Sequence, residues 1–477
     1  MPGLNISRKE AAERSATIST QSYQVSIDVT KGNEYFLTKS FVKFSAKSGA
    51  ATFIDAVGRK VLTAKLNGVD VDTSNYDGES IFLKNLADEN ELEIELEALY
   101  SKTGEGLQLS VDPVDNEVYL YSQGETAYIR KMYPCFDQPD LKATFQLTVV
   151  APSHWEIISN SPVKEVKSLD EKSKQWEFLP TPRISTYITA LVAGPYYHVH
   201  DEYQGQKKVP LGIYCRKSLA KYLDPEEIFL VTKQGFEYFE KVFGLAYPFE
   251  KYDQIAVVDF NWGAMENSGC VTFLERLLVF QSKATQQLYD QRANTILHEM
   301  AHMWFGNMVT MKWWDDLWLN ESFAEWSAHL AASEATRFTH AWTAFNSARK
   351  NWAYRQDQLG STHPIVSDMV DIETVNANFD GITYAKGASV LQQLVAHVGR
   401  ENFIAALRNY FAKHAFKNTT LDDLLIELEK TSGRDLKPWV ATWLQTAGVN
   451  TLRPEIVVSD NKYSKVNVLQ EFPKIPA

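Results

Sequence analysis

The chain has 477 residues, of which 44% are hydrophobic and 23% are charged, and its formal net charge is −12. This composition excludes a mainly disordered, collagen-like or coiled-coil chain, and the length predicts about two to four domains. The acidic charge argues against nucleic acids and anionic membranes as partners.

Two further features of the sequence concern its location. No apolar run reaches the length of about 18–20 residues that a membrane span needs, so no membrane partner is expected. The polar N-terminus lacks the apolar stretch of a signal peptide, which predicts a cytoplasmic location. Cys135, Cys215 and Cys270 are too few and too widely spaced for a disulfide framework or a thiolate zinc site, so they are expected to be buried.

The first part of the chain, residues 1–197, is predicted to be an all-β domain. Polar and apolar residues alternate with a period near two over 22–30 and 40–48, which is typical of half-buried strands. Turn signals such as Asn67-Gly68 separate these short runs. The pattern favours a sandwich or a barrel.

Longer periodic segments follow, and they predict a mixed α and β domain over residues 198–448. One strand is expected over 251–260. Helices are expected over 226–244, 286–305, 321–335, 385–398 and 420–431. Two strand-like runs then occupy residues 449–477, which are interpreted as the beginning of a further β domain.

The segment beginning at His298 carries the strongest chemical signal. His298 and His302 are four residues apart, so both imidazoles project from one face of a helix and can bind one Zn²⁺. Glu321 follows His302 after 18 intervening residues, in the first turn of the helix expected over 321–335, and is the predicted third ligand. Glu299 can take a proton from the attacking water and later return it. The alternative is a structural helix with a buried histidine, and the downstream glutamate argues against it.

A second motif, NWGAMENSG, lies upstream at residues 261–269, directly after the strand expected over 251–260. Taken alone, a polar loop with one glutamate is normally a solvated turn. Together, GAMEN, HExxH and the later glutamate resemble the aminopeptidase N family of zinc metallopeptidases, the gluzincins. The opening of the chain is similar to actinobacterial members. Further stretches that match the family are 130–145, 306–326, 362–365 and 379–391.

The resemblance implies a fold and an activity. The expected fold is an N-terminal all-β saddle or sandwich domain, a thermolysin-like α+β zinc catalytic domain, and the start of a small β domain, over the three ranges given above. The large helical domain that follows in the family would be absent. The expected activity is that of a zinc-dependent aminopeptidase of the membrane alanyl aminopeptidase type, with one Zn²⁺ per chain and peptides with a free N-terminus as substrates.

The resemblance also implies roles for individual residues. Glu266 of the GAMEN loop and Glu125 of the N-terminal domain would bind the α-amine of the substrate, and Tyr384 would donate a hydrogen bond to the oxyanion. The loop residues expected to contact substrate are Gly263, Ala264, Met265 and Asn267. Trp262, where relatives often carry a smaller residue, is expected to line a pocket for the first side chain of the substrate, with Gln123, Met265 and Phe379.

Other residues near these motifs are expected to be structural. The five tryptophans at 304, 313, 314, 318 and 326 are expected to pack around the zinc helices. His363, in a Thr-His-Pro loop, is interpreted in the same way. Glu325 either orients a ligand histidine or is an exposed helical carboxylate.

Two rival functions stay open on the sequence alone. A thermolysin-like endopeptidase would share the zinc site but lack the amine anchors, and Glu125 and Glu266 argue against it. A non-catalytic or partner-dependent fragment is favoured by the short C-terminus and disfavoured by the complete set of catalytic residues. An uncovered apolar surface would favour self-association or a separate C-terminal chain.

Overall fold

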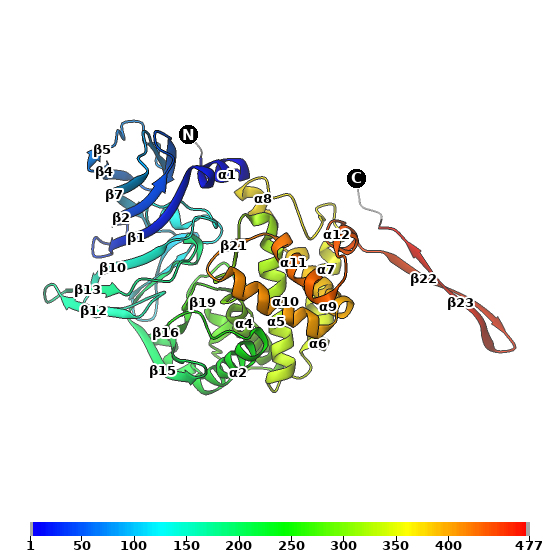
Figure 1. Cartoon of the computed structure of the whole chain (residues 1–477). Helices are drawn as coiled ribbons and strands as arrows, with labels where there is room; N and C mark the ends of the chain where they lie inside the picture. Colours follow the sequence, from blue (N-terminus) through cyan, green and yellow to red (C-terminus); the bar gives the residue numbers. More distant parts are fainter. Residues whose placement is uncertain (1–2, 474–477) are drawn as a thin grey trace.

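The structure, a computed structural model, describes residues 3–473. An N-terminal part built from β-sheets is followed by a mainly helical part and then by a β-hairpin (Figure 1). The three cysteines are free and buried, as predicted. None of the helices within 3–473 combines the length and the apolar character needed to cross a membrane.

The N-terminal part is built from two main sheets. The eight-stranded sheet has the order β12 (Val163–Ser168), β13 (Ser173–Phe178), β10 (Thr144–Pro152), β1 (Ile18–Asp28), β2 (Tyr35–Ala46), β7 (Glu89–Leu99), β4 (Lys60–Leu66) and β5 (Val69–Asp70). The four-stranded sheet has the order β11 (Glu156–Ser159), β14 (Leu191–Gly194), β9 (Val118–Gln123) and β8 (Gly106–Val111). A small sheet pairs β3 (Thr52–Asp55) with β6 (Ser80–Leu83).

Alternating burial explains why these residues form strands. β1 and β2 are antiparallel, and their side chains alternate between the core and the surface. The strands predicted over 22–30 and 40–48 are therefore confirmed, although both begin earlier than predicted.

One helix interrupts the predicted all-β part. α1 (Arg8–Thr17) begins at Ser7, whose side chain accepts a hydrogen bond from the Glu10 backbone while the Glu10 carboxylate accepts one from the Ser7 backbone. This capping box satisfies backbone donors at the helix start, and it is visible in the sequence as Ser-x-x-Glu. The prediction of strands alone for this part was wrong at α1.

A five-stranded sheet begins the second part, with the order β15 (Tyr196–Gln204), β16 (Lys208–Arg216), β17 (Tyr252–Val257), β19 (Cys270–Leu274) and β18 (Ala264–Met265). β17 confirms the predicted strand, and β18 forms one edge of the sheet. The change of sheet falls between Gly194 and Tyr196. The exact domain bounds stay predictions.

The helices pack against this sheet and against one another. They are α2 (Pro225–Phe243), α3 (Glu275–Leu278), α4 (Gln286–His302), α5 (Leu317–Ala335), α6 (Ala341–Ala344), α7 (Lys350–Gln356), α8 (Ile372–Ala377), α9 (Gly387–Val398), α10 (Arg400–His414), α11 (Leu421–Ser432) and α12 (Lys437–Trp443). Two π-helical turns, η5 (Phe345–Arg349) and η6 (Ile382–Lys386), precede α7 and α9. The short strands β20 (Thr310–Met311) and β21 (Asn418–Thr419) pair in parallel.

The start of α5 corrects one prediction. This helix begins at Leu317, four residues before the predicted start, so Glu321 lies in its second turn and not in the first. Leu317, Trp318 and Leu319 are buried, and their packing extends the helix toward the N-terminus. The hairpin of β22 (Thr451–Ser459) and β23 (Lys462–Glu471) projects away from the rest of the molecule, with nearly all of its residues exposed (Figure 1).

Candidate active site

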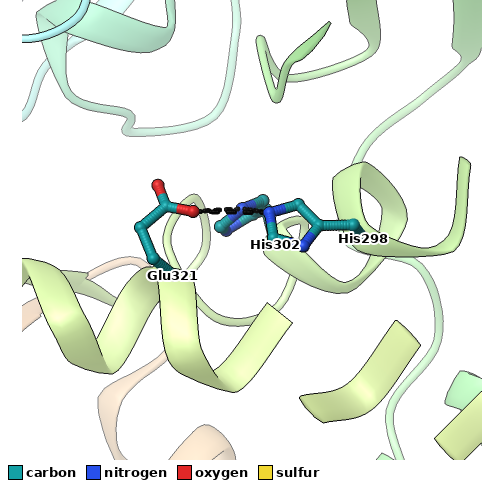
Figure 2. Close-up of side chains that lie close together, drawn as sticks. All are labelled: His298, His302 and Glu321. Atoms are coloured by element: carbon teal, nitrogen blue, oxygen red, sulfur yellow. Dashed lines mark hydrogen bonds and ion pairs between the residues drawn. The ribbon is translucent and has the colours of Figure 1, made fainter. Parts of the chain in front are cut away.

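Two packed helices bring the three predicted metal ligands together. His298 and His302 lie on the last turns of α4, and Glu321 faces them from α5 (Figure 2). The two Nε2 atoms are 3.1 Å apart, and Glu321 Oε2 lies 3.3 Å from His298 Nε2 and 3.6 Å from His302 Nε2. A tetrahedral zinc ion with bonds of about 2.0–2.1 Å holds its ligand atoms about 3.3–3.4 Å apart. The two imidazoles and the carboxylate therefore fit Zn²⁺ in both chemistry and spacing.

The ring of His302 is fixed by Asn320. His302 Nδ1 donates to Asn320 Oδ1 at 2.8 Å, and this bond orients the ring so that Nε2 faces the other ligands. Gly306 lies directly against this pair with a φ of 125°, and a Cβ there would collide with the Asn320 side chain. Glycine at this position therefore permits the close approach.

Glu325 contributes to the same centre from the next turn of α5. Its Oε2 lies 3.7 Å from His298 Nδ1, and both of its oxygens accept from Arg349, at 2.7 and 2.8 Å. Burial acts to raise the pKa of Glu325, but the positive charges of Arg349 and His329 outweigh burial and lower this pKa to about 2. Glu325 is thus a buried carboxylate beside a ligand histidine. This position agrees with the interpretation that it orients that histidine and excludes an exposed helical carboxylate.

Electrostatics separate the ligand carboxylate from the neighbouring glutamates. Burial acts to raise the pKa of Glu321, but the nearby His302 and His298 lower it to about 2, so Glu321 is ionised and ready to bind a cation. Burial raises the pKa of Glu299 well above its usual range, and only His302 opposes this shift. Glu299 lines the same cavity as the metal ligands, and its carboxylate lies within 4.8 Å of the ligand atoms of His302 and Glu266.

Two more carboxylates converge beside the metal ligands. Glu125 follows β9, and Glu266 follows the edge strand β18. Carboxylate oxygens of Glu125, Glu266 and Glu321 all lie within 4.8 Å of one another. Glu266 accepts from the Asn320 side chain at 3.3 Å, whereas Glu125 Oε1 is buried without a hydrogen-bond partner among the described residues. Burial, followed by repulsion from Glu266, raises the pKa of Glu125 well above its usual range.

Tyr384 is held over the metal ligands by the π-helical turn η6. Its ring lies nearly parallel to that of His298, with the centroids 6.1 Å apart. Burial and the surrounding carboxylates raise its pKa well above the ordinary value, so the phenol is protonated and can donate a hydrogen bond. π-helical turns occur frequently at functional sites, and η6 sets the direction of this side chain.

One cavity of about 830 Å³ is lined by the three metal ligands together with Glu125, Glu266, Glu299, Glu325, Arg349 and Tyr384. Trp262 and Phe379 also line it, with their ring centroids 5.3 Å apart, and Gly263 and Ala264 border it. The remaining predicted contact residues, Gln123, Met265 and Asn267, do not line the cavity. Gln123 and Met265 are buried behind it, where the Gln123 amide donates to the Met265 sulfur at 3.5 Å, and Asn267 donates to Thr272.

Two residues of the site are not predicted from the sequence. Asn320 directly precedes Glu321, so its position was the available signal, whereas Arg349 contacts a residue 24 positions away and no local pattern indicates it. Trp352 lines the cavity and lies beneath the Arg349 guanidinium at 4.7 Å. His363 pairs with Asp380 outside the cavity lining, and the five predicted packing tryptophans are buried outside it.

Comparison with known proteins relates this geometry to a family. Residues 19–188 match the Peptidase M1 N-terminal domain, and residues 229–443 match the Peptidase family M1 domain. The whole chain is 51% identical to an aminopeptidase N of Streptomyces lividans, covering 56% of that protein. Over 92% of the chain it is 34% identical to a leucyl aminopeptidase of Saccharolobus solfataricus, covering 55% of that relative.

The similarity extends to an animal protein. Over 68% of the chain it is 35% identical to a glutamyl aminopeptidase of Bos taurus, covering 34% of that relative. The chain spans about half the length of the curated relatives to which nearly all of it can be aligned. With an N-terminal β-rich domain and a mainly helical domain that both match, and with the metal-ligand geometry in place, the chain belongs to peptidase family M1.

Proposed function

We propose that the chain is a zinc-dependent aminopeptidase that removes the first residue of peptides with a free N-terminus. The observation that carries the proposal is the buried pair of Glu125 and Glu266 beside the metal ligands. Two buried carboxylates this close repel one another, and a substrate ammonium between them relieves the repulsion. Because the anchors adjoin the metal ligands, they leave room for one residue between the amine and the reacting carbonyl.

The proposed mechanism assigns one role to each side chain. His298, His302 and Glu321 hold a single Zn²⁺, which when bound polarises the scissile carbonyl and acidifies the attacking water. Glu299 accepts a proton from that water and passes it to the leaving amine. Tyr384 donates to the oxygen on which negative charge develops.

The cavity supports a role for Trp262 and Phe379 in recognising the first side chain. Both rings line the cavity that also holds the two anchor carboxylates. The amino acid preferred there stays open, since the relatives carry aminopeptidase N, leucyl and glutamyl names. The assignment to the membrane alanyl aminopeptidase type stays a prediction, and so does the cytoplasmic location of the protein.

A pair of reporters tests the proposal. Alanine p-nitroanilide and its N-acetyl form are compared on zinc-loaded protein, with Glu299→Gln as the control for contaminating peptidases. Each charge-assisted hydrogen bond contributes about 1.5–3 kcal/mol, so losing two slows the acetylated reporter by about 10²- to 10⁴-fold. Equal rates would assign the chain to the endopeptidase class. Zinc binding without turnover of either reporter would favour a non-catalytic fragment.

Self-association, or binding to a separate chain, stays a prediction, and the surface of the β22–β23 hairpin favours it. The β22–β23 hairpin exposes a set of large apolar side chains, which are Leu452, Ile456, Val457, Val458, Tyr463, Val466, Val468 and Phe472. Exposed apolar clusters favour self-association or binding to another protein. Light scattering against protein concentration tests this expectation, and a monomer at all concentrations would contradict self-association.

A further inference from the structure

The turn after α4 connects the metal ligands to the amine anchor. Asn307 lies five residues after His302, and its backbone N–H donates to the His302 carbonyl at 3.0 Å. Its side-chain Nδ2 donates to the Glu266 carbonyl at 2.7 Å. One fully buried residue therefore joins the end of the metal-binding helix to the loop that carries Glu266.

The N-terminal domain reaches the same turn through Lys142. This lysine lies just before β10 and is only 3% exposed, and its Nζ donates to the carbonyls of Asn307 at 3.1 Å and Met308 at 3.0 Å. Burial and the neighbouring Arg183 both lower its pKa, and no carboxylate of residues 3–473 pairs with it. Burying a lysine without an acidic partner is costly. The two hydrogen bonds that Lys142 donates to this turn offset part of that cost.

We propose that Lys142 and Asn307 are positioning residues that fix the Glu266 carboxylate relative to the metal ligands. They act in series, because Lys142 holds the backbone of the turn and Asn307 holds the backbone of Glu266 from that turn. The inference rests on the proposed function, since it assigns Glu266 to the substrate amine. A misplacement of about 1 Å at an anchor costs about 10²-fold in rate, so the spacing between anchor and metal needs such support.

Two probes separate the anchor from the metal. Isoamylamine carries an ammonium group for the anchor, and acetohydroxamate binds the metal without an amine. Their dissociation constants are measured by calorimetry on the zinc-loaded chain for wild type, Lys142→Met, Asn307→Leu and the double variant. Val149→Ala, a buried core change on β10, is the matched control for lost stability.

The proposal predicts a selective loss. Each single variant binds isoamylamine about tenfold more weakly and acetohydroxamate within about twofold of wild type, since it removes hydrogen bonds that support the anchor and not the metal ligands. The double variant matches the larger single effect, because residues acting in series are not additive. Val149→Ala leaves both constants unchanged. If Lys142→Met does not fold, the two constants of Asn307→Leu decide the question.

Other results would overturn the inference. Equal weakening of both probes would mean general damage to the fold, and losses that multiply in the double variant would mean independent roles. Normal binding of isoamylamine by both single variants would remove the positioning role altogether. A wild-type protein that binds acetohydroxamate but not isoamylamine would instead refute the amine anchor, and with it the proposed function.

Discussion

Removing the Arg349 side chain is expected to destabilise the protein and loosen the metal centre. Arg349 holds both oxygens of Glu325, and the pKa of that buried carboxyl is lowered from its ordinary 4.5 to about 2. This difference corresponds to about 3 kcal/mol at neutral pH. Since the Arg349 side chain is 36% exposed, water screens part of the interaction, and we expect Arg349→Met to lower the free energy of unfolding by about 2 kcal/mol.

The pH dependence of this loss has a definite direction. Because the pKa of Glu325 is lower in the folded state than in the unfolded state, the ionised carboxyl stabilises the fold at pH values above about 4.5. That stabilisation falls as the pH drops toward 2, and more than half of it is lost by about pH 3. The difference between wild type and Arg349→Met should therefore be complete at pH 7 and shrink in acid.

Urea unfolding of the two proteins from pH 7 to pH 3 measures this difference, and heating should show a midpoint lowered by about 4 °C. Arg400→Met is the matched control, because Arg400 also contacts both oxygens of a glutamate, Glu334, but on the surface. An exposed pair contributes less than about 1 kcal/mol. Zinc affinity should fall about tenfold in Arg349→Met and stay unchanged in Arg400→Met, because Arg349 holds the Glu325 carboxylate beside the ligand His298. Equal effects of the two variants, or a difference that persists in acid, would refute this reasoning.

Three further substitutions test single roles. Glu299→Gln should keep its zinc and lose about 10²- to 10⁴-fold in kcat, as metal analysis and reporter kinetics would show; loss of the metal would mean that the residue is a ligand. Tyr384→Phe should lower kcat by about 10²- to 10³-fold with little change in KM, and a change in KM alone would reject an oxyanion role. Trp262→Ala should change the ranking of aminoacyl reporters without changing zinc content, and an unchanged ranking would reject its place in the first pocket.

Much of the metal centre was predictable because it depends on local spacing. Two histidines four residues apart share a helix face wherever the helix forms, so His298 and His302 needed no tertiary information. The alternation of polar and apolar residues likewise predicted β1 and β2. The capping box of Ser7 and Glu10 was equally local, and α1 could have been predicted from it.

The supporting contacts could not be predicted because they join distant segments. The start of α5 depends on the packing of Leu317, and the bond from Lys142 to the carbonyl of Asn307 spans 165 residues. No local pattern encodes either feature, since both follow from packing between segments that are distant in the sequence. The same holds for Arg349, which contacts Glu325 only in the folded chain.

The run over 130–145 shows the same limit. It matched the family without a stated role, and the structure places two of its charges in a buried network. Arg130 pairs with Asp137 at 3.3 Å and with Asp55 at 3.1 Å, and Asp55 also binds Arg14 at 2.7 Å. Two of these four residues lie far outside the run. The network supports the segment that follows Glu125, so this part of the run is structural, whereas Lys142 near its end contacts the turn after α4.

Zinc content is the most direct measure of the central claim, which is that His298, His302 and Glu321 form one metal site. Wild-type protein and His302→Ala are purified, saturated with zinc, dialysed and analysed for metal, and thermal unfolding confirms that the variant is folded. The account predicts one zinc ion per chain in the wild type and nearly none in His302→Ala. The same zinc content in both proteins would contradict it.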